Sequence, residues 1–413
     1  MRHCIKHTVV ALLLIASPGV LFSQGGSTYS SLGIGDLRSW VGAQYDALSG
    51  TQIGMPTPYG VNLVNPSLMG FTPTTRIQAG YHFNQHINSD GTNSLAQNSG
   101  SFDGLVAMFS VDTARGFAVS LSLTPSSKVA YLLQRNISAT YDGGTVTGKS
   151  VQLGEGGVSN ASLAASVRLT KDLRFGIGIS GLFGLMTYSD KLFIDGNYSQ
   201  VFSTQTFDLR GFMYRTGLYW EPLQNFGIGA FIAGGGNGTT IVTKRAAGSV
   251  GGRVYIDTVL SNEVETPLPL QYGLGISTQV GRGRIGADVQ INDFQGMNVN
   301  LRSDANYTNG IRSSIGYAYF GSQNPGAEFL DRIGWYLGAS YQTSYVTYQG
   351  NTIREYSGST GISFPLGGNA MVDAAVSLGK RETGVVDSIS ELFGRLTVTV
   401  SIGEVWFKPF ARD

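Results

Sequence analysis

The sequence predicts an all-β protein, a transmembrane antiparallel β-barrel of about 14 strands whose lumen holds an N-terminal hatch. Three observations support this fold class. Charged residues make up only 13% of the 413 residues, about half of the roughly 25% in an ordinary soluble domain. Apolar and polar side chains alternate along most of the chain beyond residue 74. Glycine is abundant at 58 residues while proline is scarce at 12, which indicates many turns or close backbone approaches.

Charge and hydropathy exclude two other classes. The formal net charge is +1, so the chain lacks the basic field that attracts nucleic acid, and no nucleic-acid partner is expected. After the first two dozen residues no run of 18 or more consecutive apolar residues occurs, which argues against helical membrane spans.

Residues 1–23 have the layout of a signal peptide. Arg2 and Lys6 precede the apolar run of residues 9–16, and Ser17 and Pro18 end that run. The single cysteine, Cys4, lies in this segment. The mature chain is therefore expected to contain no disulfide and no thiolate metal ligand.

Alternation beyond residue 74 has the period of β-strands joined in hairpins. Leu163 and Val167 share one face of the segment 161–169, Ser162 and Arg168 share the other, and the pattern resumes at 173 after a short turn. A soluble β-sandwich also alternates. Strands of about ten residues, alternately short and long connections, and small or polar residues opposite the apolar ones favour a membrane barrel.

The chain divides into a signal peptide (1–23), a hatch (24–73) and a barrel (74–413). We expect strands at about residues 74–86, 101–111, 115–124, 159–169, 173–187, 204–220, 225–241, 266–280, 284–295, 307–320, 331–344, 352–364, 370–381 and 390–404. An even strand number places both termini in the periplasm, with the short turns, in the outer membrane of a Gram-negative cell. Residues 125–158 alternate on their own and are a candidate extracellular hairpin.

Closure of the sheet follows from its surroundings. Outward side chains meet hydrocarbon, where an unpaired backbone amide costs several kcal/mol, so a sheet without edges is required. A barrel of about 14 strands has a lumen wider than its own side chains fill. Residues 24–73 do not alternate and number about fifty, so they are predicted to fold inside that lumen as a hatch.

Two stretches of the predicted hatch carry a family resemblance. They are Tyr29-Ser30-Ser31-Leu32-Gly33-Ile34-Gly35, and Asn65-Pro66-Ser67-Leu68 shortly before the first strand. These stretches resemble the FadL family of outer-membrane transporters for long-chain fatty acids and other hydrophobic compounds. In that family a hatch lies in a fourteen-stranded barrel and has an Asn-Pro-Ala motif, in which Ser67 replaces the alanine here. The resemblance runs thinly over most of the chain and is closest to a branch found in Bacteroidetes-type bacteria.

The resemblance implies an outer-membrane channel for passive uptake of fatty acids or other hydrophobic small molecules, gated by the hatch. A ligand would enter from the extracellular loops and leave through the barrel wall into the membrane, with outer-membrane lipids as neighbours. Burial is favourable for an acyl chain at about 0.8 kcal/mol for each CH₂. The hatch and ligand-contact candidates are Val61, Leu63, Val64, Asn65, Pro66, Leu68 and Met69. Ordinary hatch packing is the alternative for the apolar ones, and Asn65 and Pro66 are expected to fix a turn.

Charged residues on the polar side of the strands form a second candidate group. They are Arg168, Arg215, Asp288, Arg312, Asp373 and Arg395. A wet lumen tolerates such charges, and an arginine there can bind a ligand carboxylate through two hydrogen bonds. Pairing with lumen acids or with the hatch is the alternative. Arg215 and Arg312 are the preferred ligand-binding candidates because they lie well inside their strands.

Catalysis finds little support in the sequence. Beyond the signal peptide the only histidines are His82 and His86, too few for most catalytic triads or metal sites. No Gly-x-Ser-x-Gly motif occurs, and the glycine-rich run 234–240 lacks the Gly-Lys-Ser/Thr ending of a phosphate-binding loop. We expect no enzyme activity, no metal and no cofactor.

Two other functions remain open at this level. A FadL-like scaffold subunit of a secretion or surface-attachment machine would have a protein partner from that machinery. A general porin would conduct small polar solutes and would need no tight hatch.

Overall fold

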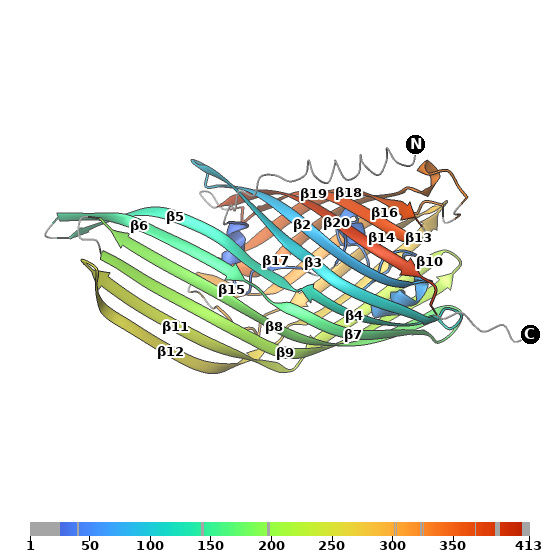
Figure 1. Ribbon diagram of the computed structural model, residues 1–413, viewed down its shortest axis with the longest axis horizontal. Coiled ribbons are helices and arrows are strands. Elements are labelled where there is room, and N and C mark those ends of the chain that lie inside the picture. Colours follow the sequence, from blue (N-terminus) through green and yellow to red (C-terminus); the bar gives the residue numbers. More distant parts are fainter. Residues whose placement is uncertain are drawn as a thin grey trace, which may run out of the picture.

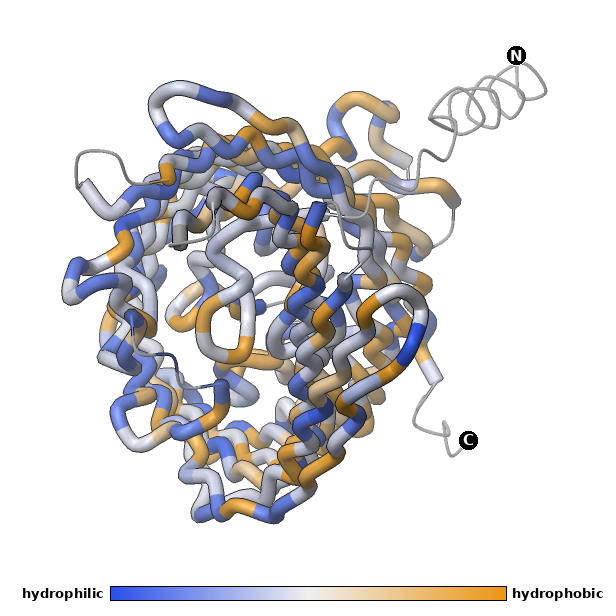
Figure 2. The backbone as a smooth tube through the Cα atoms, turned by 90° about the vertical axis from the view of Figure 1, so that its left-hand side faces the viewer, coloured by the Kyte–Doolittle hydropathy of each residue, from blue (hydrophilic) through white to orange (hydrophobic). Residues whose placement is uncertain are grey.

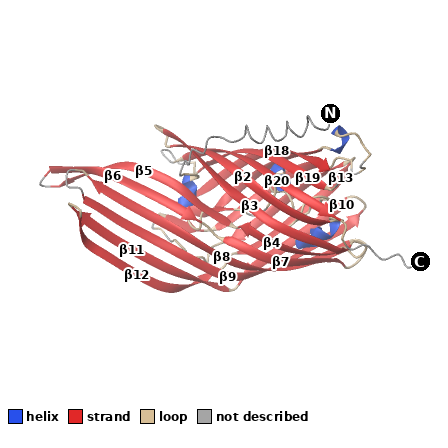
Figure 3. Ribbon diagram, in the orientation of Figure 1, coloured by secondary structure: helices blue, strands red, loops and turns tan. Residues whose placement is uncertain are grey.

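The computed structural model describes residues 25–406 except 39–40, 142–143, 196–198, 301, 303, 323, 325, 368 and 385–388. Figure 1 shows a barrel of tilted strands, with further strands that project beyond one of its ends. Strands make up nearly all of the regular structure, and the few helical turns are short (Figure 3). The predicted signal peptide, residues 1–23, lies outside the described residues.

Fourteen antiparallel strands close the barrel, as the sequence predicted. In order around the wall they are β2 (Thr75–Ser89), β3 (Ser94–Asp112), β4 (Phe117–Pro125), β7 (Ser159–Arg168), β8 (Leu173–Ile194), β9 (Ser199–Leu223), β10 (Phe226–Gly235), β13 (Leu270–Val280), β14 (Gly283–Asp293), β16 (Asn309–Tyr319), β17 (Gly334–Tyr348), β18 (Asn351–Gly367), β19 (Ala370–Glu382) and β20 (Ser390–Glu404). The first and last of these strands, β2 and β20, pair along their whole length and close the sheet.

The distribution of side chains across the wall separates a barrel from a sandwich. On β20, Val400 and Ile402 point outward and are 45% and 61% exposed, whereas Thr397 and Thr399 point into the lumen and are 0% and 1% exposed. The apolar face is therefore the outer one and the polar face is buried. A sandwich would bury its apolar face, so the outward apolar side chains form a surface for lipid.

The apolar belt ends at a defined level on β9. Going up this strand from its short turn, the outward positions carry Trp220, Leu218, Thr216, Tyr214 and Phe212, and all but Thr216 are large and exposed. The next outward position is Arg210, which forms an ion pair of 2.7 Å with Asp208. Exposed charges are costly in hydrocarbon. The part of β9 beyond Phe212 therefore lies outside the lipid belt.

The strands outside the barrel are where the prediction from sequence fell short. β5 (Ser127–Tyr141) and β6 (Gly144–Gly156) form the hairpin suspected within residues 125–158. A second hairpin, β11 (Asn237–Val250) and β12 (Arg253–Pro267), was not foreseen. Residues 225–241 are not one strand but split into β10 and β11, because the run Gly234-Gly235-Gly236 lets the chain leave the barrel wall there.

The two hairpins extend the wall into an open sheet beyond the barrel, here called the extension. Its strand order is β5, β6, β8, β9, β11 and β12, with the long ends of β8 and β9 as its centre. Figure 1 shows the extension at the end of the barrel opposite the C-terminus. The barrel thus has a short-turn end, where β2 begins and β20 ends, and a long-loop end that carries the extension.

The segment before β2 contacts lumen-facing residues of the wall, as predicted for a hatch, and Figure 2 shows chain inside the ring of strands. It contains the 3-10 helix η1 (Thr28–Ser31), the short strand β1 (Asp36–Leu37), the helix α2 (Ala43–Ala47) and the 3-10 helix η2 (Pro66–Phe71). Elsewhere the described chain adds η3 (Leu330–Arg332) and the short strand β15 (Ala305–Tyr307). Among the described residues no helix is long and apolar enough to cross a membrane.

Candidate functional site in the barrel lumen

Paired glycines in the wall receive the backbone of the hatch. Gly176 of β8 and Gly217 of β9 lie directly opposite each other in the sheet. A Cβ atom on Gly176 would lie 2.4 Å from the amide nitrogen of Ser67, and one on Gly217 would lie 2.1 Å from Oδ1 of Asn65. Neither distance is possible for a real side chain. The glycine pair therefore forms a notch in the wall that receives the hatch backbone, and any residue with a Cβ atom at these two positions would fill it.

A second glycine pair repeats the device on the neighbouring strands. Gly229 of β10 lies opposite Gly275 of β13. A Cβ on Gly229 would lie 2.0 Å from the carbonyl oxygen of Ile53, and one on Gly275 would lie 2.5 Å from the amide nitrogen of Gly54. Beside this notch the Asp288 carboxylate accepts hydrogen bonds from the amides of Gln52 and Ile53 at 2.5 and 2.7 Å. Close backbone approach and a charged acceptor thus fix the same turn of the hatch.

The Asn65-Pro66 turn has the conformation that the sequence predicts. Asn65 is extended, with φ −113° and ψ 92°, and Pro66 begins η2. The Asn65 amide donates to the carbonyls of Ile53 and Leu218 at 2.8 and 3.0 Å, and its Oδ1 accepts from the Ser67 hydroxyl at 2.6 Å. Ser67, where the FadL motif has alanine, therefore contributes a hydrogen bond of its own to the turn.

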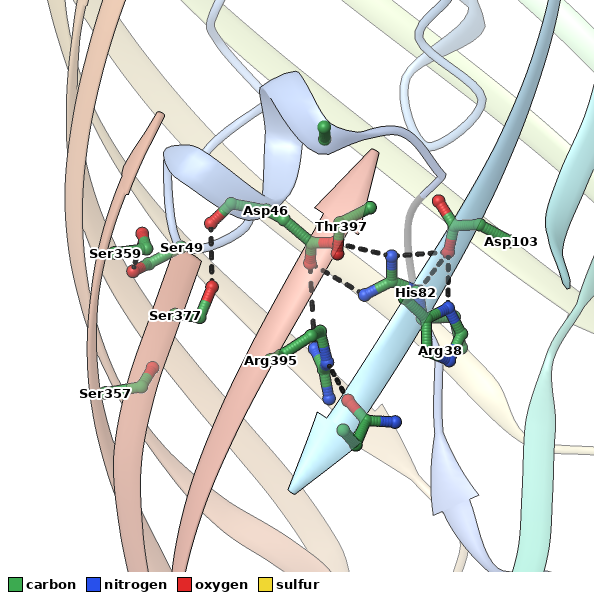
Figure 4. Close-up of polar contacts among 12 residues, drawn as sticks. Arg38, Asp46, Ser49, His82, Asp103, Ser357, Ser359, Ser377, Arg395 and Thr397 are labelled. Atoms are coloured by element: carbon green, nitrogen blue, oxygen red, sulfur yellow. Dashed lines mark hydrogen bonds and ion pairs between the residues drawn. The ribbon is translucent and has the colours of Figure 1, made fainter. Parts of the chain in front are cut away.

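An arginine of the hatch joins two buried carboxylates. Arg38 donates to both oxygens of Asp46 at 2.7 and 2.8 Å and to Oδ1 of Asp103 on β3 at 2.5 Å (Figure 4). His82 of β2 lies 3.2 Å from the same Asp103 oxygen. The side chains of Arg38, Asp46 and Asp103 are 7%, 1% and 0% exposed. This cluster ties the hatch to β2 and β3 and is called the hatch ion cluster below.

The wall strand β20 completes the surroundings of Asp46. Thr397 donates its hydroxyl to Oδ2 of Asp46 at 2.5 Å, and Arg395 lies 3.6 Å from Oδ1 (Figure 4). Burial of the Asp46 carboxyl works against its charge, but the Arg38 guanidinium outweighs it and holds the pKa of Asp46 below its ordinary value. The carboxylate is therefore ionised throughout the neutral range.

A second arginine binds the N-terminal part of the hatch from the wall. Arg381 of β19 lies 2.7 Å from Asp36 of the hatch, 2.7 Å from Glu355 and 3.6 Å from Glu391. The sequence pattern singled out neither these residues nor most of the hatch ion cluster. Arg38, Asp36 and Asp46 lie in a segment without alternation, so no period indicated that Arg38 and Asp46 pair, and their other partners, Asp103 and Arg381, are far along the chain.

The apolar hatch candidates divide into two groups. Leu63 and Val64 line a cavity of the lumen whose walls include many apolar side chains. Val61 and Met69 instead pack against a buried cluster of β3, β4 and β7, the ordinary packing that the sequence left as the alternative, and Leu68 is also buried.

The six charged candidates also occupy different places. Arg312 donates to the hatch carbonyls of Ser49 and Gly50 at 3.3 and 2.8 Å, so it holds the hatch, as Asp288 does. Arg395 belongs to the surroundings of Asp46, and Asp373 accepts a hydrogen bond from Ser363. Arg168 is exposed at the short-turn end, where it bonds to the carbonyl of Ala114. Arg215 differs from all of these because it borders the cavity.

The cavity lies on the long-loop side of the hatch and measures about 100 Å³. Leu182 of β8, Leu209 and Met213 of β9, and Leu268 supply its apolar walls. Phe294 and Met297, from the connection between β14 and β15, also line it and are almost fully buried. These side chains belong to the largest buried apolar cluster of the protein. The cavity therefore combines these apolar walls with polar side chains, among them Arg38 of the hatch ion cluster, Asn160 and Ser180.

Arg215 is the charged group that the cavity presents without a counter-ion. It donates to the carbonyl of Val64 in the hatch at 3.0 Å and to Oε1 of Gln271 at 3.4 Å, and its guanidinium lies 5.3 Å from the centre of the Phe231 ring. Within the described residues no carboxylate lies within 4.0 Å of its nitrogens. A guanidinium held in this way can accept an anionic ligand group.

The wall between β4 and β7 is thin beside the cavity. Ser162 and Leu163 of β7 line the cavity on the lumen side, and they also line a groove on the lipid-facing side with Leu121 of β4 and Phe212 of β9. Ser162 is directly opposite Ser122 in the sheet, and the two hydroxyls are hydrogen-bonded. At this position a single layer of wall, with the small side chains of Ser122 and Ser162 at its centre, separates the cavity from the lipid belt.

No cluster of three or more His, Cys, Asp or Glu side chains suited to a metal ion occurs among the described residues. The two histidines of the described residues face the lumen next to acids, His82 beside Asp103 and His86 beside Glu391.

Comparison with known proteins places this architecture. A family model described as BamG matches residues 4–410. The comparison with curated proteins gave no match. Solved structures share the fold, and one is the Ralstonia pickettii toluene transporter TbuX, with a TM-score of 0.61 and 16% identity over 88% of this chain and 98% of that one. A Pseudomonas aeruginosa FadL homologue has a TM-score of 0.60 and 12% identity over 89% of this chain and 98% of its own. The Pseudomonas putida toluene transporter TodX has a TM-score of 0.59 and 16% identity over 91% of this chain and 100% of its own. The predicted FadL-like barrel fold is confirmed.

Proposed function

We propose that this chain, which belongs to the BamG family, is an outer-membrane channel for passive uptake of hydrophobic molecules that carry a carboxylate, with long-chain fatty acids as the best-fitting class. The single observation that carries the proposal is Arg215, a guanidinium without a carboxylate partner among the described residues, at the edge of an apolar cavity. An acyl chain fits the apolar walls at about 0.8 kcal/mol for each buried CH₂. Its carboxylate would bind Arg215 through charge-assisted hydrogen bonds.

The arginine separates this chain's proposed ligand from those in the neighbours' names. TbuX and TodX are named as toluene transporters, and toluene is a neutral ligand. A guanidinium can offer such a ligand a cation–π contact but no charge-assisted hydrogen bond, so most of its donors would remain unused and partly desolvated beside it. Arg215 therefore supports an anionic ligand for the present chain. The proposed protein is a channel, not an enzyme.

Movement of the hatch or of the loop over the cavity is part of the proposal. A cavity of about 100 Å³ is smaller than the roughly 300 to 1,000 Å³ of typical small-molecule sites. A fatty acid therefore fits only when a neighbouring segment moves. Val64 is a candidate for that segment because Arg215 bonds to its carbonyl oxygen. A ligand carboxylate that takes over the guanidinium would weaken this bond and thereby loosen the hatch.

The β4–β7 wall is the proposed exit to the membrane. The cavity and the lipid-facing groove share Ser162 and Leu163, so a ligand needs to part only one strand pair at its small side chains. The tight hatch disfavours an open porin, because its backbone sits in glycine notches and its charges are paired with the wall.

The ligand prediction is tested at Arg215. In Arg215→Gln we expect binding of oleate to the purified barrel to weaken at least tenfold, because a charge-assisted bond of about 1.5 to 3 kcal/mol is lost. Binding of the uncharged methyl ester should change little. Arg210→Gln is the matched control, since Arg210 is exposed and pairs with Asp208 on the outer face of the same strand. Equal loss for acid and ester, or no loss for either, would remove the proposed ligand class.

The exit is tested with a reversible cross-link. The mature chain is expected to contain no cysteine, so Ser122→Cys with Ser162→Cys creates a single disulfide across β4 and β7. Oxidation should reduce uptake of labelled oleate at least tenfold, and reduction should restore it. The control pair is Ser340→Cys with Ser357→Cys, which are likewise opposite and hydrogen-bonded on β17 and β18. Unchanged uptake in the oxidised β4–β7 variant would remove this exit but would leave the role of Arg215 intact.

A further inference from the structure

The last strand of the extension has a free edge. In the described part of the chain β12 pairs with β11 alone, whereas β11 pairs with both β12 and β9. A free edge presents unpaired N–H and C=O groups, which form a ready template for another strand. β12 has 15 residues, well above the usual five or six. Its one proline, Pro267, is its last residue, so no proline interrupts the edge.

This edge strand carries large apolar side chains in contact with water. Val254, Tyr255, Ile256, Val259 and Leu260 are between 58% and 68% exposed. Natural edge strands usually carry charges, prolines or covering segments that prevent pairing. A long edge with five exposed apolar residues is the opposite arrangement, and it is typical of an interaction surface.

Lipid does not explain the exposure. Leu260 lies opposite Lys244 of β11, and Lys244 lies opposite Gln205 of β9. Gln205 is five positions beyond Arg210, whose ion pair with Asp208 marks the upper limit of the apolar belt. These apolar side chains therefore project beyond the hydrocarbon, on the long-loop side of the membrane (Figure 1).

The charges along β12 distinguish its two ends. Asp257 is neutralised by Arg245 of β11 at 2.9 Å. Closer to the barrel, Glu263 and Glu265 have no basic side chain within ion-pair distance among the described residues. The edge is therefore apolar over residues 254–260, with Arg253 at its outer tip, and acidic near the barrel. A complementary strand would be apolar at one end and basic at the other.

A second copy of this chain is a poor occupant. Two copies in one membrane are related by a twofold axis along the membrane normal, so that equivalent residues of the two edges would face each other. Glu263 and Glu265 would then meet the same acids of the partner copy, and like charges directly opposite each other are destabilising.

We propose that the free edge of β12 binds an extended segment of a different protein by β-sheet addition. The segment would be apolar opposite residues 254–260 and basic opposite Glu263 and Glu265. Backbone hydrogen bonds along the edge would supply affinity, and the alternating side chains would supply selectivity. The proposal concerns the extension and does not depend on the channel function of the barrel.

A synthetic strand tests the edge on the full chain in nanodiscs. The probe is a 13-residue fluorescent peptide of alternating valine and threonine with two lysines near its N-terminus, which antiparallel pairing places opposite Glu263 and Glu265. We expect saturable binding and slower hydrogen exchange confined to β12. Methylation of alternate peptide nitrogens should weaken binding at least tenfold, because it removes the donors of the new ladder. Absent binding, or equal binding of the methylated peptide, would overturn the proposal.

Two variants serve as matched controls, one that reverses the charges of β12 and one that changes a charge elsewhere on the extension. Glu263→Lys with Glu265→Lys should reduce peptide binding at least tenfold. Lys149→Glu should leave it unchanged, because Lys149 is exposed on β6 of the same extension but its strand pairs on both sides. In native outer membranes, a photo-crosslinker at Val259 should capture a heterologous polypeptide that the charge reversal releases, and one at Lys149 should not. A dimer of the chain itself, a lipid adduct alone, or capture that survives the reversal would contradict the proposal.

Discussion

The two halves of the lumen are built on different chemistry. On the short-turn side, the hatch meets the wall through backbone contacts at paired glycines and through the buried charges of Arg38, Asp46 and Asp103. On the long-loop side, the hatch residues Leu63 and Val64 face an apolar cavity. The first interface is tight and its buried charges are paired, which suits a seal. The second is loosely filled and has one cation without a counter-ion among the described residues, which suits a ligand.

This difference indicates which part of the hatch can move at a low cost in free energy. Moving the hatch at the ion cluster would leave buried carboxylates without their guanidinium, and a broken buried pair costs about 3 to 5 kcal/mol. Moving an apolar segment over the cavity costs only the contacts that a hydrophobic ligand can replace. We therefore expect the sealed half to stay fixed during transport and the cavity half to change shape.

The largest expected effect comes from removing the central cation of the seal. Arg38→Met leaves Asp46 and Asp103 buried without their guanidinium, and we expect hatch docking to weaken by about 3 to 5 kcal/mol. The measurement is the rate of maleimide labelling of a cysteine introduced at the buried residue Thr51, which should rise strongly. Arg210→Met removes an exposed pair and should alter the rate little. An unchanged rate in Arg38→Met would show that the charges do not hold the seal.

A smaller effect is expected from filling a glycine notch. Gly217→Val places a side chain where Oδ1 of Asn65 now lies, so the Asn65-Pro66 turn must move. Overpacking of this kind costs about 1 to 3 kcal/mol. Labelling at the introduced Thr51→Cys should therefore rise, though less than in Arg38→Met. The matched control is Gly358→Val on β18, where an added Cβ meets nothing within 4 Å. Similar labelling in both valine variants would contradict the notch.

The smallest effect is expected from pH. Because the pKa of Asp46 in the folded protein is held below its ordinary value, its contribution to docking is fully present above about pH 4, the ordinary value for an aspartate. That contribution is lost only as pH falls through the still lower folded value. Maleimide reacts with the thiolate, so hatch labelling is taken at each pH relative to an exposed reference cysteine. This ratio should be constant between pH 8 and pH 5 as far as Asp46 is concerned, and it should rise only in stronger acid. A rise already between pH 7 and pH 5 would mean that Asp46 does not anchor the hatch at neutral pH.

Much of the barrel could be predicted from local pattern. Alternation fixes which residues of a strand face outward, so the period alone assigns Val400 to lipid and Thr399 to the lumen. The Asn65-Pro66 pair likewise dictates its own extended conformation and turn. The hairpin β11–β12 was not predicted because its outer residues are exposed on both faces, so apolar and polar side chains need not alternate there.

The sequence identified some residues of the candidate site but not which of them face the cavity. Parity placed Arg215 and Arg312 in the lumen equally, yet Arg312 holds hatch carbonyls while Arg215 borders the cavity. Their difference depends on which hatch atoms lie opposite each of them. The glycine notches could not be identified either, because a glycine in a strand looks the same whether or not a backbone approaches it.

Three features follow from the amino-acid sequence alone: the closed sheet, its apolar outer surface and a separate N-terminal segment. The side-chain period defines the outer surface and marks the segment that does not alternate, and the cost of unpaired amides in hydrocarbon requires closure. Only the tertiary structure decided which charges are paired, where the cavity lies and which strand edge stays open. Those features depend on contacts between residues hundreds of positions apart, such as Asp46 and Thr397, and no local pattern records which residues will meet.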